Sequence, residues 1–581
     1  MNPHTQAVKG QRGSAFIVVL FLSLVSVVMV GTFLKTAIDR LKGVELRSAQ
    51  NAAFNAAESG LSMVVEEIWG IYQREAPHQR IAALDALDGK IIEQDRIKYL
   101  NQRLDPCTYD AFVREVRTVG GDYADVEIVC TAKNARACKT LMAVVRFGRQ
   151  PSRIFDHAYF INNFGWLWGE NITINGDVRS NGNFSTQNPR INGDVIAAEN
   201  PELGAAGTVT VEGNSGNQSI EDYNATASPQ ARPTNPSAPS EDLNQNGRLD
   251  PGEDANGNGT LDTYFREGGY DGESELLPYQ AKLEMPYLGD LDYYRKLAVA
   301  QGGTLSQGGS TVIDGVLGDA EGEPDSILLV GTEKNPIVIN GPVVVEADVV
   351  LRGYIQGQGT IYAGRNVHVI GDLQYVNGPS WEKPVYNTDE VWKVNKTKDL
   401  VGLVAKGSIL VGDYTEADWK STIKKYQNPP FTVPYIVDST DAVNGYVSYE
   451  QDGTPYFDGD YTNLDGGKKD DGKGGTTSRR YIESSFSDDE VHARAQAGLV
   501  TRIDAIMYTN HLISGRVGSM TTHGTIVARD EAFIFTDRFT VNYDIRVHGS
   551  GYEQIDVYLP REPSRHVLYW GEGLAREEPE S

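Results

Sequence analysis

One uninterrupted apolar run near the N-terminus constrains this chain more than any other feature. Residues 14–34, SAFIVVLFLSLVSVVMVGTFL, contain no charged side chain over 21 positions. At 1.5 Å per residue, such a helix is roughly 30 Å long, which matches the hydrocarbon thickness of a bilayer. Lys9 and Arg12 precede the run, which favours a cytoplasmic N-terminus with the remainder of the chain outside. We therefore expect a single-pass membrane anchor, because the run is too long for a secretory signal peptide.

The residues after this run are expected to continue the same helix. Proline is absent from residues 35–69. Apolar side chains recur along one stripe of the expected helix. They are Leu41, Val44, Ala52, Ala56 and Leu61. The sequence therefore predicts that a membrane helix passes directly into a long amphipathic helix, together residues 14–75.

This pattern resembles the N-terminal spine of type IV pilins and type II secretion pseudopilins. Basic residues, then Gly13, then an apolar run that begins at Ser14 match the leader of prepilins. Segment 51–61, NAAFNAAESGL, is similar to the second half of the spine in PilX-type minor pilins. The resemblance covers about the first 70 residues and implies that a prepilin peptidase removes residues 1–13. An ordinary single-pass anchor is the alternative.

Position five of the mature chain departs from the major pilins, which carry a glutamate there. Counting from Ser14, this position is Val18, as in K-type minor pseudopilins and some PilX-type proteins, which are associated with filament tips. The resemblance thus implies a tip-located minor pilin or pseudopilin whose partners are other pilins or pseudopilins. Before assembly it would span the inner membrane once, with the bulk of the chain periplasmic or extracellular, and afterwards lie in a cell-surface filament.

The region that follows reads as a small α+β module. After a short helix-like stretch at 79–93, alternating segments at 111–117, 124–130 and 140–147 predict three strands joined by turns. A long helix followed by a small antiparallel sheet is the order found in pilins, and the sheet would cover the apolar stripe of the helix.

Three cysteines lie in this module, on the outer side of the membrane, where a disulfide can persist. They are Cys107, Cys130 and Cys138. Cys130–Cys138 closes a hairpin-sized loop and is the favoured pair. Three free thiols are the alternative.

Beyond residue 150 the sequence repeats. The pentapeptide INGDV occurs at 174–178 and again at 191–195, and a longer repeat aligns 359–372 with 524–537. Each copy combines short β-branched runs with a glycine, and such runs bury a core only when they stack. We therefore expect an α+β pilin-like module followed by an all-β region, an interrupted β-solenoid of the parallel β-helix type. An antiparallel β-sandwich is the alternative.

These patterns divide the chain into nine expected segments. They are the leader (1–13), the spine helix (14–75), the α+β module (76–150), a first solenoid segment (151–214), an insertion with calcium loops and a helix (215–305), a second solenoid segment (306–413), an insertion with a helix at 415–426 and an acidic Gly/Asp loop (414–500), a last solenoid segment (501–560) and a C-terminal tail (561–581).

The insertion at 215–305 holds the clearest chemical motif. Residues 242–253, DLNQNGRLDPGE, place oxygen ligands and the turn glycine where a twelve-residue calcium loop requires them. An overlapping copy from 254 has Phe265 at position 12 and lacks the closing carboxylate, so its occupancy stays open. The predicted Ca²⁺ ligands are Asp242, Asn244, Asn246, Arg248 through its carbonyl, Asp250 and Glu253, then Asp254, Asn256, Asn258, Thr260 and Asp262.

Charge and motif content restrict the function further. A net charge of −26 repels phosphate backbones, so we expect no nucleic-acid partner. The sequence contains no GxSxG, HExxH, Walker loop or CxxC, and we expect no enzyme. Two functions stay open. One is a pilin-like subunit that presents a calcium-stabilised β-solenoid for adhesion or assembly, with a surface polysaccharide or a host or substrate surface as target. The other is a non-polymerising membrane-anchored adhesin or carbohydrate-active β-helix protein.

Overall fold

The computed structural model of the 581-residue chain forms two units. Unit 1 comprises Met1–Glu75, Gln79–Arg149 and Pro563–Ser581, and unit 2 comprises Ala76–His78 and Gln150–Glu562. The structure describes residues 12–75, 79–97, 107–119, 123–169, 171–187, 189–213, 216–218, 276–286, 288, 291–318, 325–379, 394–423, 448–449, 455–456, 468–470, 476–478, 486–548 and 554–572.

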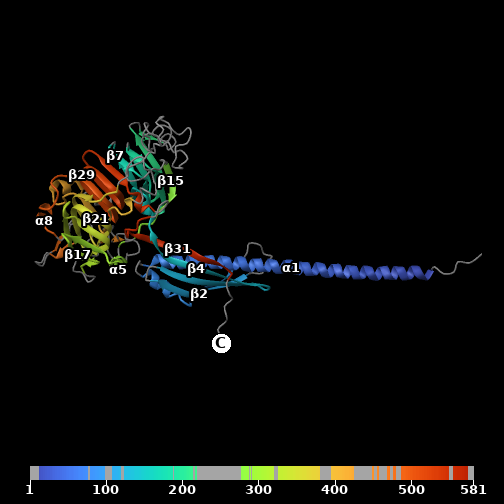
Figure 1. Ribbon diagram of the computed structural model, residues 1–581. Coiled ribbons are helices and arrows are strands. Elements are labelled where there is room, and N and C mark those ends of the chain that lie inside the picture. The colour runs from blue at the N-terminus through green and yellow to red at the C-terminus, as the bar shows by residue number, and fades with distance from the viewer. Residues whose placement is uncertain are drawn as a thin grey trace, which may run out of the picture. The chain divides into compact units, whose positions relative to one another are not determined.

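Unit 1 is a long helix beside an antiparallel sheet (Figure 1). Helix α1 (Arg12–Arg74) runs unbroken for 63 residues, as its lack of proline predicts, and the short α2 (Arg80–Asp85) follows. The sheet has the order β1-β2-β3-β4-β31. Its strands are β1 (Ile91–Ile97), β2 (Cys107–Val119), β3 (Tyr123–Lys133), β4 (Cys138–Pro151) and β31 (Arg561–Glu572). The three strands expected at 111–117, 124–130 and 140–147 are confirmed as β2, β3 and β4.

Two sequence-based expectations for unit 1 are wrong. The helix-like stretch 79–93 ends at Asp85, and Ile91 instead lies opposite Phe112 in the antiparallel β1–β2 pair. Residues 561–572 are not a tail but the strand β31, at one edge of the sheet. Such a strand cannot be recognised from neighbouring turns, because its partner β4 lies some 400 residues earlier in the chain: Gln150 Nε2 donates to Glu562 Oε1 across 412 positions.

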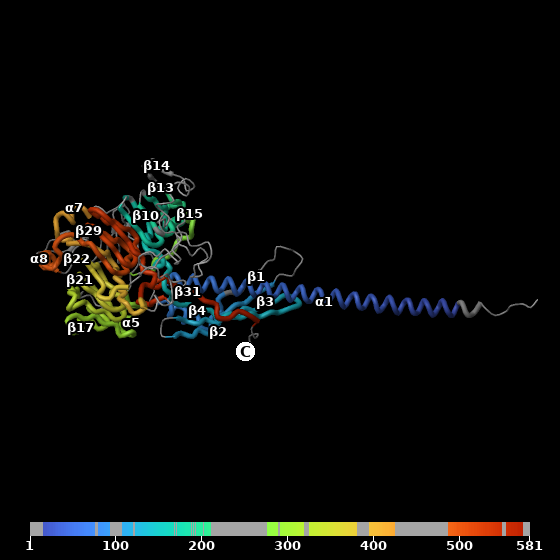
Figure 2. Tube along the Cα trace, turned by 45° about the horizontal axis from the view of Figure 1, so that its top comes forward, coloured from blue at the N-terminus to red at the C-terminus, as the bar shows by residue number. Residues whose placement is uncertain are grey.

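Unit 2 is built around one sheet of 18 strands, of which β10, β15, β17, β21, β22 and β29 are labelled in Figure 2. Its strands are β5 (Tyr159–Ile161), β7 (Ile172–Asn175), β8 (Val178–Ser180), β10 (Arg190–Asn192), β11 (Val195–Asn200), β12 (Ala205–Ala206), β15 (Leu276–Ala281), β16 (Thr304–Gln307), β17 (Ser310–Asp314), β18 (Val316–Leu317), β19 (Ile327–Gly331), β20 (Ile337–Val345), β21 (Val349–Ala363), β22 (Val367–Tyr375), β23 (Leu400–Ala405), β24 (Ile409–Val411), β29 (Val500–Phe535) and β30 (Phe539–Tyr543).

Smaller elements complete the described part of unit 2. They are the sheet of β6 (Gly165–Trp168), β9 (Phe184–Gln187), β13 (Val209–Gly213) and β14 (Gly216–Gln218), the strand pairs β25 (Ser448–Tyr449) with β26 (Pro455–Tyr456) and β27 (Lys468–Asp470) with β28 (Thr476–Ser478), and the helices α5 (Asp292–Gln301), α7 (Ala417–Ile423) and α8 (Asp488–His492). The helix expected within the insertion 215–305 is confirmed as α5, and the one expected at 415–426 as the shorter α7.

Most strands of the large sheet pair in parallel with constant register. Ile337 lies opposite Ile355, which is 18 residues later in the chain. A second column, six residues further along β21, continues across longer connections, with Ile361 opposite Leu403 and Leu403 opposite Met507. All five side chains are fully buried, so each short strand contributes one layer to a continuous apolar core.

The repeated sequences lie on adjacent strands, as stacking requires. Ile174 of the first INGDV copy is opposite Ile191 of the second, and Asp177 Oδ1 accepts a hydrogen bond from the backbone N–H of Asp194 at 2.7 Å. The sandwich alternative is not supported by this sheet, because a sandwich of that kind requires antiparallel pairs.

The order of strands in space differs from their order in the chain. Ile526, near the end of β29, lies opposite Tyr159 in β5, at the start of unit 2. From there the parallel pairing continues through Val178 and Val195 to Leu276. In the spatial order of the sheet, the strands of residues 159–281 therefore come after those of residues 304–543, although they precede them in sequence.

Candidate functional site

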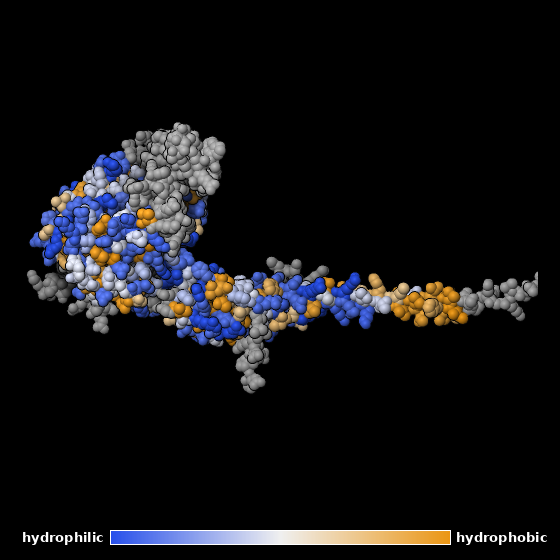
Figure 3. All heavy atoms as spheres, in the orientation of Figure 1, coloured by the Kyte–Doolittle hydropathy of each residue, from blue (hydrophilic) through white to orange (hydrophobic). Residues whose placement is uncertain are grey.

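The first half of α1 exposes an apolar surface that the described part of the chain does not cover. From Phe16 to Ser48 every residue is exposed except the half-buried Val25 and Ala37. The most apolar 18-residue window of this helix has a mean hydropathy of 2.8 and no buried residue, and the helix is long and apolar enough to cross a membrane. The apolar side chains gather at the end of the helix that is drawn away from the rest of unit 1 in Figure 3. An N-terminal helix with this surface fits a single-pass membrane anchor.

The second half of α1 is instead covered by the sheet of unit 1. Small residues let the sheet come close: Ala53, Ala56 and Ala57 are fully buried, and Leu61 fills the next turn. Gly60 marks the closest approach, because a Cβ at that position would lie 2.5 Å from Tyr109 Cδ2. An ordinary side chain at residue 60 would therefore push the helix away from β2.

Aromatic side chains close this contact at the C-terminal end of α1. The rings of Trp69 and Tyr72 stack at 5.7 Å, and Phe147 of β4 lies against both. Tyr72 Oη donates a hydrogen bond of 2.7 Å to the carbonyl of Gly148. The guanidinium of Arg565, in β31, lies over the Trp69 ring at 5.3 Å. One helix thus has an apolar half open to its surroundings and a half fixed against five strands.

The expected processing site lies at the start of this helix. Gly13 and Ser14 fall in the first turn of α1, which begins at Arg12. Val18, at the position where major pilins carry glutamate, has an exposed side chain. The sequence thus presents an apolar group near the start of the exposed half.

The predicted calcium ligands, from Asp242 to Asp262, lie outside the described residues. The structure therefore leaves the two calcium loops as predictions. The nearest described elements are β14, which ends at Gln218, and β15, which begins at Leu276.

The favoured disulfide does not form, and none of the three cysteines is in a disulfide. Cys130 lies opposite Leu141 and Cys138 opposite Lys133, so the two cysteines are three positions apart along the β3–β4 ladder. At roughly 3.4 Å per position this offset exceeds the Cα separation of about 7 Å that a disulfide can span. Cys107 sits four positions from the residue opposite Cys130 in the β2–β3 ladder. The short separation of Cys130 and Cys138 in sequence suggested a disulfide across a hairpin, but the register of the strands places the two residues too far apart.

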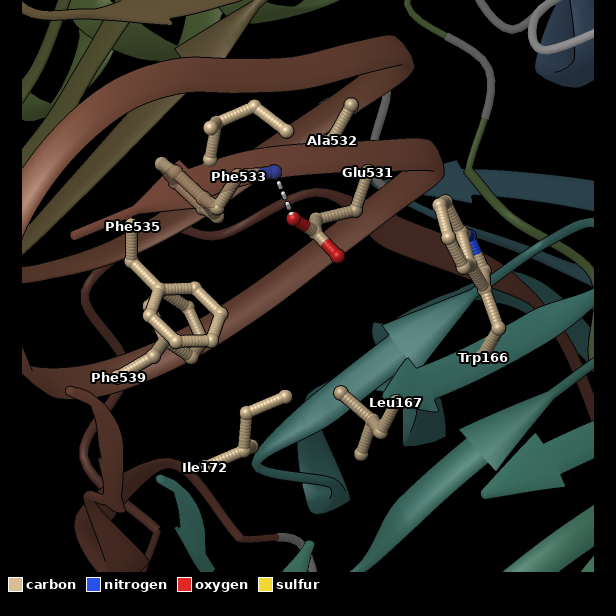
Figure 4. Close-up of a pocket in the computed structure, with 9 residues that line it drawn as sticks. Trp166, Leu167, Ile172, Glu531, Ala532, Phe533, Phe535 and Phe539 are labelled. Carbon is tan, nitrogen blue, oxygen red and sulfur yellow. Dashed lines mark hydrogen bonds between the residues drawn. The ribbon is translucent and has the colours of Figure 1, made fainter. Parts of the chain in front are cut away.

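A pocket in unit 2 is a second candidate site, because its lining contains an ionisable side chain (Figure 4). Glu531 lies within it, and Tyr159 Oη donates to Glu531 Oε2 at 2.7 Å while the Phe533 N–H donates to the other carboxylate oxygen. Burial raises the pKa of Glu531 to about 7, and the nearby Asp530 acts in the same direction, whereas the two hydrogen bonds act against it. The pocket is lined by Trp166, Leu167, Ile172, Glu531, Ala532, Phe533, Ile534, Phe535 and Phe539.

Sequence reasoning did not single out Glu531. The signal was present in the longer repeat, whose two copies align Glu531 with Asn366. Where one repeat copy has a carboxyl group and the other has an amide at the same position, the two copies are expected to pack differently there. Glu531 is the one carboxyl-bearing residue among those that line this pocket.

Comparisons with known proteins give little further guidance. No family model matches the chain, and no curated protein matches it. Among solved structures, the chain is similar to the competence-associated pilin ComZ from Thermus thermophilus, with 10% sequence identity over 89% of this chain and 96% of that chain. The TM-score of 0.25 is too low to carry an argument about fold or function.

Proposed function

We propose that this chain is a pilin-like subunit, anchored in the inner membrane by residues 14–34 and incorporated into a filament through α1. The single observation that carries the proposal is the division of α1 into an open apolar half and a half fixed on a small antiparallel sheet. A helix keeps all its backbone hydrogen bonds inside lipid and inside a helical bundle alike, so it can move from one to the other without unfolding. The leader-like sequence that ends at Gly13 agrees with this assembly route.

The proposal includes the partners and the position in the filament. A prepilin peptidase would release Ser14 as the mature N-terminus, and other pilins or pseudopilins would pack against α1 in a type IV pilus or a type II secretion-like filament. Val18 offers no carboxylate to neutralise a neighbour's amine. We therefore infer a minor subunit at the tip, above other subunits and sparse in the filament.

Unit 2 would be the part that such a subunit presents outside the cell. We infer that its parallel rows are rungs of an interrupted β-solenoid, supported by the 18-residue register and the stacked INGDV copies. Its role would be adhesion or assembly, on a surface polysaccharide or a host or substrate surface, without catalysis and without a nucleic-acid partner.

Calcium would stabilise the insertion at 242–262. Free carboxylates of Asp242, Asp250 and Glu253 repel one another in a chain of net charge −26, and a divalent cation offsets this repulsion. We expect millimolar Ca²⁺ to protect this segment from protease, and Glu253→Gln to remove the protection because it removes one carboxylate charge of the bidentate ligand. Unchanged cleavage with and without Ca²⁺ would show that the loops bind no calcium.

Val18 also favours a second candidate, a membrane-anchored adhesin or carbohydrate-active protein that never polymerises. The two candidates differ in where the mature chain is found. Mechanical shearing of cells should release a filament fraction that contains the chain if it is a pilin-like subunit. A chain that stays entirely in the membrane fraction, in cells that make filaments, would overturn the first candidate and support the second.

A further inference from the structure

Three side chains of the kinds that bind transition metals converge in unit 2, and none of them lines the Glu531 pocket. Asp413 follows β24, Glu416 directly precedes α7, and His492 is the last residue of α8. One ligand atom of each residue lies within 4.8 Å of the other two. Asp413 and His492 are 79 positions apart in sequence, so the cluster joins the two ends of the insertion expected at 414–500.

The Asp413 carboxylate is held in place by its neighbours. It is nearly buried, with 7% of its side chain exposed. Its Oδ1 accepts a hydrogen bond of 3.0 Å from the Thr415 N–H and another from the Thr415 hydroxyl, and its Oδ2 lies 2.6 Å from His492 Nδ1. Hydrogen bonds to one oxygen of a carboxylate fix the direction of the other, which is how outer-shell groups orient metal ligands.

The two helices that carry the other ligands are anchored independently of the cluster. Trp419 of α7 and Val491 of α8 are buried in one small core, and Trp419 Nε1 donates to the carbonyl of Val411 at 2.7 Å. Lys420 Nζ lies 2.8 Å from Asp488 Oδ2 and joins the helices at the surface. Glu416 and His492 are therefore brought to Asp413 by packing that does not depend on a cation.

We propose that Asp413, Glu416 and His492 bind a divalent transition cation such as Zn²⁺. One imidazole nitrogen and two carboxylate oxygens suit Zn²⁺ and its neighbours, whereas Ca²⁺ takes oxygen ligands only. Bonds of about 2.0–2.2 Å in a tetrahedral site place ligand atoms roughly 3.3 Å apart, so His492 Nδ1 and Asp413 Oδ2 need to separate by less than about 1 Å. The exposed side chains of His492 and Glu416 have room for this rotation.

Such a cation would link the two ends of the insertion at 414–500. It replaces one His–Asp contact by bonds to three residues from two ends of a long stretch of chain, and it offsets two negative charges. Because it binds the folded arrangement and not the unfolded chain, it would stabilise unit 2 by an amount that rises with the logarithm of its concentration above the dissociation constant. This site is separate from the predicted calcium loops at 242–262 in both sequence and donor chemistry, and it does not depend on the pilin-like function.

The test is a Zn²⁺ titration of the full chain in detergent. Titration calorimetry measures the stoichiometry and affinity, and scanning calorimetry measures the melting temperature. The protein is first stripped with a chelator and then kept in about 1 mM Ca²⁺, which occupies oxygen-only sites of extracellular affinity. We expect one equivalent of Zn²⁺ to bind at micromolar concentration and to raise the melting temperature of unit 2 by a few degrees. Glu416→Gln and His492→Gln, both at exposed positions, should each weaken binding at least tenfold.

A matched control separates this site from general surface binding. His566, in β31, is also an exposed histidine, and His566→Gln should leave the Zn²⁺ affinity unchanged. The proposal is overturned if the His492→Gln chain binds Zn²⁺ as tightly as the original chain, or if no binding occurs up to 1 mM. Either result would show that Asp413 and His492 form only a hydrogen-bonded pair.

Discussion

The two halves of α1 have the same secondary structure and opposite surroundings. Residues 16–34 expose apolar side chains almost continuously and residues 35–48 add exposed charged ones, whereas the half from Ala49 to Tyr72 buries a face of small, aliphatic and aromatic residues against the sheet of unit 1. The first half is rich in Val, Leu and Phe, which is typical of a surface that meets lipid. The second half replaces them by alanines and Gly60, which allow a close approach. The comparison teaches that a helix surface can be apolar in both halves, and that small residues at the points of closest packing let one of them lie against a sheet.

The largest expected effect lies in the fixed half. Ile68 is fully buried among the residues between α1 and the sheet, so Ile68→Ala should destabilise unit 1 by about 3–4 kcal/mol through lost burial and a residual cavity. Leu41→Ala, in the open half, should leave that stability unchanged because Leu41 is 64% exposed. Hydrogen exchange of β3 peptides in the full chain measures the difference. Equal protection in the two variants would mean that the fixed half is not supported by the sheet.

The next effect concerns the open half. Leu24→Arg places a charge near the middle of the apolar run and should lower membrane insertion by about 2.5–3.5 kcal/mol. The control, Leu41→Arg, puts the same charge beyond the run, where we expect normal insertion. Protease protection in membrane vesicles reports both. Normal insertion of the Leu24→Arg chain would show that this half does not face lipid.

Glycines sharpen the comparison within one helix. Gly60→Ala should destabilise unit 1 by about 2 kcal/mol, because the new Cβ would meet the Tyr109 ring at 2.5 Å. At Gly70 a Cβ meets nothing within 4 Å, so Gly70→Ala should be neutral or stabilise the helix by about 0.5–1 kcal/mol. The same exchange measurement distinguishes these outcomes. A destabilising Gly70→Ala, or a harmless Gly60→Ala, would contradict the described contact between α1 and β2.

The smallest expected effect removes one hydrogen bond. Tyr72→Phe keeps the ring against Phe147 but leaves the carbonyl of Gly148 without its 2.7 Å donor, at a cost of about 1 kcal/mol. Denaturant unfolding, followed through β4 peptides, is sensitive enough to detect it. No loss of stability would indicate that water replaces the hydroxyl at this end of the helix.

Local patterns made much of this fold predictable. The long proline-free helix, the strands β2 to β4 and the stacking of the INGDV copies at 174–178 and 191–195 follow from period, turn residues and repetition. These features depend on neighbours in sequence or on a repeat that is visible in it. The interactions that determine these features act between residues close in sequence or between repeat copies, so the sequence alone predicts them.

The remaining features depend on register and on distant pairing. Strand β31 completes a sheet some 400 residues after β4, and β29 continues into β5 against the order of the chain. The separation of Cys130 from Cys138 follows from a ladder offset that spacing alone does not reveal. The cluster of Asp413, Glu416 and His492 likewise joins residues across 79 positions. No local pattern encodes these encounters, because they arise from which strands lie side by side.

The central claim is that a peptidase removes residues 1–13, and that α1, then starting at Ser14, is the spine helix of a pilin-like subunit. Mass spectrometry of the chain's N-terminus, purified from membranes that contain an active prepilin peptidase, tests this most directly. The account predicts a mature chain that starts at Ser14, an uncleaved Gly13→Val variant and normal cleavage of the control Gly10→Val. A chain that retains Met1 under these conditions, or that is cut at any other residue, would contradict it.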